Sequence, residues 1–212
     1  MLFVSLKTIS MKFIFKQSLF LLLSVLIVAL AVVALFLDIH WLHNDVKELS
    51  ITEVSQELIL AVIIGINVFQ TVRGRERTRI SVLIAGFFGC MLIREMDFLF
   101  DAIAFGSWVW FALAVAAVSL FLGLKKPAEA VNQLAVFMRH PAYGMMFSGL
   151  LCILIFSRLF GMHILWQQLL QDEYIRVVKN AVEEGSELFG YLLCLMSTCW
   201  YLATNRKTDR CG

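Results

Sequence analysis

Charged residues and proline are scarce in this chain. Only 16% of its 212 residues are charged and only two are proline, while 60% are hydrophobic. Soluble domains are about 25% charged and about 45–50% apolar, so the composition excludes an ordinary soluble domain and indicates an integral membrane protein. The net charge of +2 is too small to indicate nucleic acid as a partner.

Patterns of cysteine and histidine that would indicate a redox or haem protein are also lacking. None of the five cysteines forms a CxxC pair, and four of them fall inside apolar segments, so no disulfide framework is predicted. Histidine is absent from the predicted spans, which excludes a b-type haem held between facing membrane helices. The two halves of the chain do not share the broken-helix pattern that is typical of repeat-built transporters.

Six apolar segments are each about as long as a membrane-spanning helix, which needs roughly 20 residues. They cover residues 18–37, 51–72, 80–101, 107–124, 142–160 and 183–203. The first follows three lysines and resembles a signal peptide, but its apolar run is long enough to span, so we expect an uncleaved anchor. The predicted fold is all-α: a single polytopic membrane domain over residues 1–212, with six transmembrane helices.

Two amphipathic stretches lie between the predicted spans. Residues 128–139 have a helical apolar pattern but are too short to cross a bilayer, so we expect a helix on the membrane surface. Residues 161–182 either form a second interfacial helix or extend the sixth span. Only Gly185 interrupts that continuity, and one glycine weakens a helix by about 1 kcal/mol without breaking it.

Lysine and arginine are unevenly distributed between the two sides of the predicted spans. Thirteen fall on the side of the two termini, four fall on the opposite side, and Arg94 lies within a span. Cytoplasmic loops carry the excess of positive charge in membrane proteins. The sequence therefore predicts a bacterial-type inner membrane protein with both termini in the cytoplasm.

Carboxylates recur at one depth on three of the predicted spans. With a rise of about 1.5 Å per residue, Glu57, Glu95 and Glu187 all fall roughly 6–9 Å below the outer ends of their spans. Ionisable groups at such depths cost several kcal/mol unless they are paired, so they indicate a functional site. The predicted site consists of Glu57, Glu95, Asp97, Glu184 and Glu187, with Arg94 as the internal counter-charge.

This set of carboxylates carries more negative charge than Arg94 can balance. Protonation, a bound cation, or the outer-side bases Arg158, Arg176 and Lys179 must offset the excess. Carboxylates nearer the span ends, such as Asp38 and Asp101, are expected to form ordinary interfacial ion pairs.

Histidines on the outer side raise the alternative of a metal site. His40 and His43 are three residues apart, and carboxylates with imidazole suit Zn, Fe or Mn. A divalent metal bound by the acidic set with His40 and His43 is therefore a candidate cofactor. The Glu-x-x-His pairs of di-metal helix bundles are, however, lacking from the predicted spans.

Three hypotheses about function remain open at this stage. The first is a small transporter or sensor whose outer-leaflet acidic cluster binds a cation, either a proton or a divalent metal. The second is a membrane-embedded, metal-dependent enzyme that acts on a lipid from the periplasmic side. The third is a structural or partner-binding membrane protein with an internal salt-bridge network. The expected partners are the lipid bilayer and a cation or lipid ligand, and the oligomeric state is left open.

Overall fold

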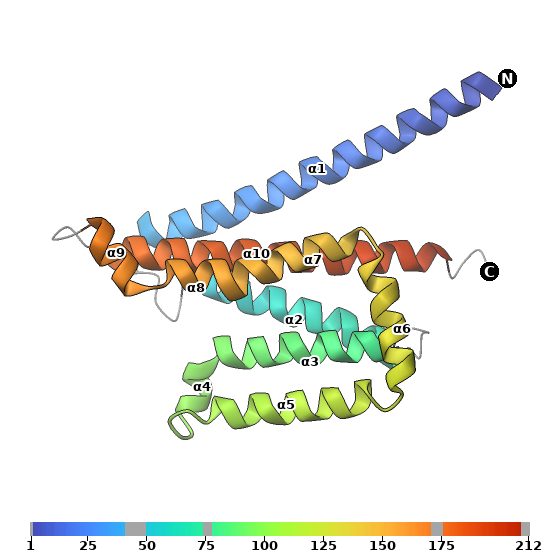
Figure 1. Cartoon of the computed structure of the whole chain (residues 1–212). Coiled ribbons are helices and arrows are strands. Elements are labelled where there is room, and N and C mark those ends of the chain that lie inside the picture. The colour runs from blue at the N-terminus through green and yellow to red at the C-terminus, as the bar shows by residue number, and fades with distance from the viewer. Residues whose placement is uncertain (1, 41–49, 74–77, 171–175, 209–212) are drawn as a thin grey trace.

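The chain forms a bundle of helices (Figure 1), described here from a computed structural model that covers residues 2–40, 50–73, 78–170 and 176–208. These residues form helices and connecting turns, with no strand among them. In chain order the elements are α1 (Leu2–His40), α2 (Ile51–Val72), α3 (Thr78–Glu95), α4 (Asp97–Asp101), α5 (Trp108–Gly123), α6 (Pro127–Met138), α7 (Ala142–Leu151), the π-helical turn η1 (Cys152–Phe156), α8 (Ser157–Phe160), α9 (His163–Leu170) and α10 (Arg176–Thr208). The prediction of an all-α fold is confirmed.

The long helices lie in layers that run roughly parallel to one another. In Figure 1, α7 and α10 form one layer, α3 and α5 form another, and α2 lies between them. Helix α6 crosses one end of the bundle, while α4 and α9 lie at the opposite end. Helix α1 contacts α10 and α2 near its C-terminal end and diverges from them toward its N-terminus. The start of α1 and the end of α10 lie toward the same end of the bundle as α6.

Among the described residues, three helical segments are long and apolar enough to cross a membrane. They are Ile14–Asp38, Ile51–Val72 and Ala142–Phe160. Helices α5 and α6 together would make a fourth, but they meet at an angle of 98°. This supports the membrane class. Six spans and the orientation of the termini stay predictions.

The helix boundaries agree with the predicted spans in some places and differ in others. Helix α2 coincides with the predicted span 51–72, and the run from α7 through α8 coincides with 142–160. Helix α6 matches the short amphipathic stretch 128–139 and bends away from α5, as an interfacial helix would. Of residues 161–182, the part from Arg176 belongs to α10 and so extends the helix of the predicted sixth span, while α9 is a separate short helix whose interfacial position stays a prediction.

The predicted third span, 80–101, is not one helix. Helix α3 ends at Glu95 and the short α4 follows from Asp97. Negative charge is unfavourable at a helix C-terminus, which opposes continuation through Asp97 and Asp101. The Asp101 carboxylate instead accepts a hydrogen bond from the Gly106 N–H at 2.8 Å. Gly106 has a φ of +74°, which glycine adopts without strain, and the chain turns there into α5.

Helices α7 and α10 approach closely where two glycines face each other. A Cβ atom added to Gly190 would lie 2.5 Å from Ile153 Cγ1 and 2.8 Å from the carbonyl oxygen of Gly149. On the other side of the bundle, a Cβ added to Gly86 of α3 would lie 2.1 Å from the Ser119 side chain of α5. Small residues at such crossings let the two backbones approach closely. In a membrane this van der Waals packing drives helix association, because the hydrophobic effect does not act between helices there.

A core of buried side chains lies where α2, α3, α7 and α10 meet. Leu60 and Ile63 of α2 pack there with Phe88 of α3 and Met146 of α7. Tyr191 of α10 is fully buried in the same cluster. Its ring packs in the apolar core, while its hydroxyl donates a hydrogen bond to the Glu95 carboxylate. Tyr191 therefore joins the core to the charged residues described below.

Because of the glycine contact between α7 and α10, we expect alanine to destabilise the fold at Gly190 but not at Gly144. Gly190→Ala should lower the free energy of unfolding by about 1–3 kcal/mol, because the added methyl meets backbone that cannot yield. Gly144→Ala is the matched control on α7, since nothing lies within 4 Å of its added Cβ. It should leave stability unchanged or raise it, as alanine favours helix. Thermal unfolding in detergent measures both, and equal stability of the two variants would contradict the close approach.

Candidate functional site

The start of α2 is tied to the end of α1 by Asp38. Its carboxylate accepts hydrogen bonds from the N–H groups of Ile51 and Thr52, at 2.7 and 2.8 Å, and from the Thr52 hydroxyl at 2.6 Å. Ser50 adds an N-cap by accepting from the Glu53 N–H at 3.0 Å. Asp38 is fully buried, so it is a helix-capping residue rather than the interfacial ion pair expected from the sequence.

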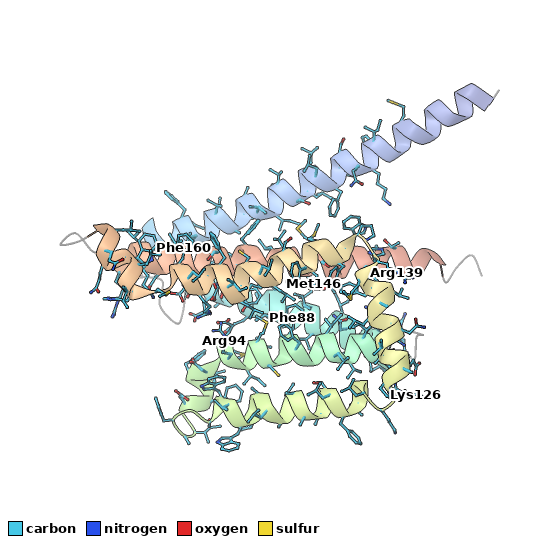
Figure 2. The ribbon with its side chains drawn as sticks, in the orientation of Figure 1. Phe88, Arg94, Lys126, Arg139, Met146 and Phe160 are labelled. Atoms are coloured by element: carbon cyan, nitrogen blue, oxygen red, sulfur yellow. The ribbon has the colours of Figure 1, made fainter. Side chains whose placement is uncertain are left out.

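Arg94 and Glu95 connect the end of α3 to α10. The Arg94 guanidinium forms an ion pair with the neighbouring Glu95 and lies 3.9 Å from Glu187 Oε2 of α10. The Tyr191 hydroxyl donates to Glu95 Oε1 at 2.6 Å. Figure 2 shows Arg94 between α3 and the α7–α10 layer. A cation at the C-terminus of α3 is also favoured by the helix dipole.

A second group of charges joins α8 to α10. Glu187 is only 2% exposed; it forms an ion pair with Arg158 and accepts a hydrogen bond from the Ser157 hydroxyl at 3.1 Å. Arg158 also lies 3.5 Å from Glu183, whose other oxygen is 2.9 Å from Lys179 Nζ. Three carboxylates, counting Glu95, are therefore balanced by three basic side chains, which offsets much of their desolvation.

Glu184 differs from these carboxylates because its partner is neutral. The side-chain amide of Gln56 on α2 donates to the backbone carbonyl and to Oε2 of Glu184, both at 3.1 Å. No base within the described ranges forms an ion pair with Glu184. Gln56 is fully buried, and its Oε1 has no hydrogen-bond partner among the described residues.

Glu57 is a second carboxylate without a base. It is half-buried on α2 and makes no hydrogen bond or ion pair to any part of the chain that the structure describes. The carboxylates of Glu57, Glu184 and Glu187 all lie within electrostatic reach of Glu95. We call Glu57, Glu95, Glu184 and Glu187, together with Arg94 and Gln56, the polar cluster.

The structure thus brings together four of the five predicted carboxylates and sets one apart. Asp97 is exposed at the start of α4, and within the described residues it forms no hydrogen bond or ion pair. The break after Glu95 turns Asp97 away from the course of α3, which is why its spacing on an unbroken helix was misleading. Asp97 is therefore not part of the polar cluster, and its predicted role in a site stays a prediction.

The metal hypothesis finds no assembled ligand set in the described ranges. No group of three or more histidine, cysteine, aspartate or glutamate side chains there is arranged to hold a metal ion. Glu95 and Glu187 direct their oxygens at basic and hydroxyl groups. His40 is the last residue of α1, and its side chain, like the whole of His43, lies outside the described part. Metal binding stays a prediction.

Sequence reasoning missed the neutral residues that donate hydrogen bonds to these carboxylates, namely Gln56, Ser157 and Tyr191. A signal for Gln56 is present in α2, where the polar residues Thr52, Gln56, Asn67 and Gln70 are all buried. They are spaced by three, four or eleven residues and so share one helix face. In a membrane helix, a polar face turned inward indicates contact with a polar interior.

Comparison with known proteins gives no further constraint. No family model, no curated protein and no solved structure matches the chain. The function of the polar cluster is therefore inferred from its contacts and charges.

Neutralising Glu187 should be costly, because its buried side chain loses the ion pair with Arg158 and accepts a weaker hydrogen bond from Ser157. We expect Glu187→Gln to lower the free energy of unfolding by about 2 kcal/mol. Asp97→Asn, an exposed carboxylate without a partner in the described chain, should change it by less than about 0.5 kcal/mol. Thermal unfolding in detergent compares the two variants. An equal effect at both positions would show that the Glu187 contacts do not stabilise the fold.

Removing the Asp38 cap should loosen the junction of α1 and α2. Asp38→Ala is expected to lower the free energy of unfolding by about 1–2 kcal/mol, because two backbone N–H groups lose their acceptor. Asp38→Asn keeps one acceptor oxygen and should recover part of the loss. Hydrogen exchange at Ile51 and Thr52 measures the local effect, and unchanged exchange in Asp38→Ala would contradict the capping role.

Proposed function

We propose that this is a membrane protein that binds a small cation, a proton or a metal ion, at the polar cluster between α2, α3 and α10, and that it acts as a small transporter or a sensor. One observation carries the proposal. Glu184 and Glu57 have no basic partner in the described chain, although they lie beside carboxylates that are each balanced by a base.

The charge balance supports a cation as the missing component. A carboxylate removed from water is costly unless something positive offsets it. Lys179, Arg158 and Arg94 are already engaged with Glu183, Glu187 and Glu95. A proton or metal ion at Glu184 would neutralise that carboxylate without rearranging these pairs.

The contact of Glu184 with Gln56 suggests how binding would be transmitted. Gln56 Nε2 donates to the same carboxylate that would receive the cation. A cation on Glu184 competes with that amide, so its binding would weaken or reorient the link between α2 and α10. A ligand that favours one of two helix arrangements shifts the population toward it, which is what both a transporter and a sensor require.

We also propose six spans, a bacterial-type inner membrane and both termini in the cytoplasm. The asymmetry of lysine and arginine supports this orientation. The start of α1 and the end of α10 lie toward the same end of the bundle, which agrees with an even number of crossings.

Cation binding is tested with Glu184→Gln and Glu57→Gln, with Asp97→Asn as the matched control. The purified proteins are analysed for bound Zn, Fe and Mn, and their unfolding temperature is measured with and without each metal. Infrared difference spectra between two pH values in metal-free buffer detect a carboxyl group that exchanges a proton. We expect a metal-dependent or proton-dependent signal in the wild type and in Asp97→Asn, and its loss in Glu184→Gln.

The same measurements can overturn the proposal. If no metal binds and the infrared difference spectra of wild type and Glu184→Gln are the same, Glu184 binds no cation. Glu95→Gln and Glu187→Gln are weaker tests, because each removes one of the two carboxylates that pair with an arginine and disturbs the fold as well.

A structural role is the second candidate, and the ion pairs that link Glu183, Glu187 and Glu95 to an equal number of bases favour it. In this role, the ion pairs fix the positions of α3, α8 and α10 relative to one another. Replacing Arg158 and Glu187 together by methionine should then restore stability relative to Glu187→Gln, since no buried charge is left unpaired. Indifference to metal and pH in the same proteins would favour this second role over cation binding.

A further inference from the structure

A groove runs between the middle of α1 and the C-terminal half of α10. It encloses a cavity of about 460 Å³. Its walls include Phe20, Ser24 and Ile27 of α1 and Met196, Trp200 and Ala203 of α10. At the end where the two helices diverge, the groove is lined by the polar residues Lys16 and Gln17 of α1 and Thr204 of α10. Ser24 lies further along the groove, and its hydroxyl donates a hydrogen bond to the backbone carbonyl of Phe20.

The groove continues along α1 toward its C-terminal end. A second cavity of about 320 Å³ lies between α1, α2 and α10 and extends along α1 as far as Ala34. Ile27 lines both cavities, so they adjoin. The second cavity is walled by apolar side chains apart from Ser55, whose hydroxyl is bonded to the carbonyl of Ile51. A ligand that enters beside Lys16 therefore meets an increasingly apolar surface.

We propose that this groove is a binding site for one acyl chain of an anionic phospholipid, whose headgroup lies at Lys16. The site is separate from the polar cluster and does not depend on the function proposed for it.

The length of the groove matches a lipid chain. Lys16 and Ile27 are eleven residues apart on one helix, or about 17 Å at the rise of an α-helix. One leaflet of the hydrocarbon core is about 15 Å deep, half of the roughly 30 Å of the whole. A chain anchored at Lys16 would reach the middle of the bilayer near Ile27, where the first cavity meets the second.

The volume of the groove suits a single lipid chain. The two cavities measure about 460 and about 320 Å³, and small-ligand sites measure about 300–1,000 Å³. The groove is open at Ser24 and Ala203, because their side chains are smaller than those of the other residues that line its two walls.

The charge at the mouth favours an anionic headgroup. The Lys16 side chain is exposed where the apolar part of α1 begins, so its ammonium group can reach the headgroup layer. A lysine near a membrane surface contributes about a fivefold preference for anionic lipid. Among the described residues, no carboxylate lines the first cavity to oppose that preference.

The proposal is tested by native mass spectrometry of the whole protein, released from detergent micelles that contain equal amounts of phosphatidylglycerol and phosphatidylcholine. The wild type should retain one lipid per chain, with phosphatidylglycerol favoured about fivefold. Lys16→Gln should lose that preference, while Lys125→Gln, an exposed lysine in the turn between α5 and α6, should keep it.

Filling the groove gives the second arm of the experiment. Ser24→Phe should reduce the retained lipid at least fivefold, while Val25→Phe, at the same depth on the exposed side of α1, should leave it unchanged. Ala203→Phe fills the groove from α10 and replaces Ser24→Phe if that variant does not fold. Equal lipid retention in the groove-filling variant and in Val25→Phe would overturn the proposal. A wild-type dimer that is lost on filling the groove would overturn it as well, because a second copy would then be the occupant.

Discussion

The burial of the Glu187 carboxylate is the constraint on which the rest of the site depends. A charged group that is 2% exposed must have positive and hydrogen-bonding partners, or its desolvation opposes folding. Arg158 and Ser157 approach it from α8, and Arg94 approaches it from α3. These contacts hold α10 to two helices that are distant in the sequence, and they set the position of Tyr191 one turn further along α10.

The packing of the helices is arranged so that these charges can meet. Gly149 and Gly190 let α7 and α10 approach closely, and η1 continues α7 into the segment that carries Arg158. A Cβ at Gly161 would lie 2.4 Å from a carboxylate oxygen of Glu183, so the absence of a side chain there leaves room for that carboxylate. Close backbone packing and charge pairing are therefore parts of one arrangement.

The acidic residues, which resemble one another in the sequence, fall into different classes in the structure. Glu95 and Glu187 are balanced by arginines, whereas Glu184 is bonded to the neutral Gln56 and Glu57 has no such partner in the described chain. Paired carboxylates stabilise contacts between helices, and unpaired ones are available to a ligand. This division corresponds to the two roles proposed for the cluster, a structural role for the paired carboxylates and cation binding for the unpaired ones.

The sequence by itself determined the helical membrane class, the bounds of α2, and the gathering of Glu57, Glu95, Glu184 and Glu187 with Arg94, because composition, apolar run length and depth along a helix are local properties. Only the tertiary structure decided that Asp97 lies apart, that Asp38 caps α2, and that Gln56 and Tyr191 donate hydrogen bonds to the clustered carboxylates. Those outcomes depend on where α3 breaks and on which helix faces meet. Both result from contacts between segments far apart in the chain, which no local pattern specifies.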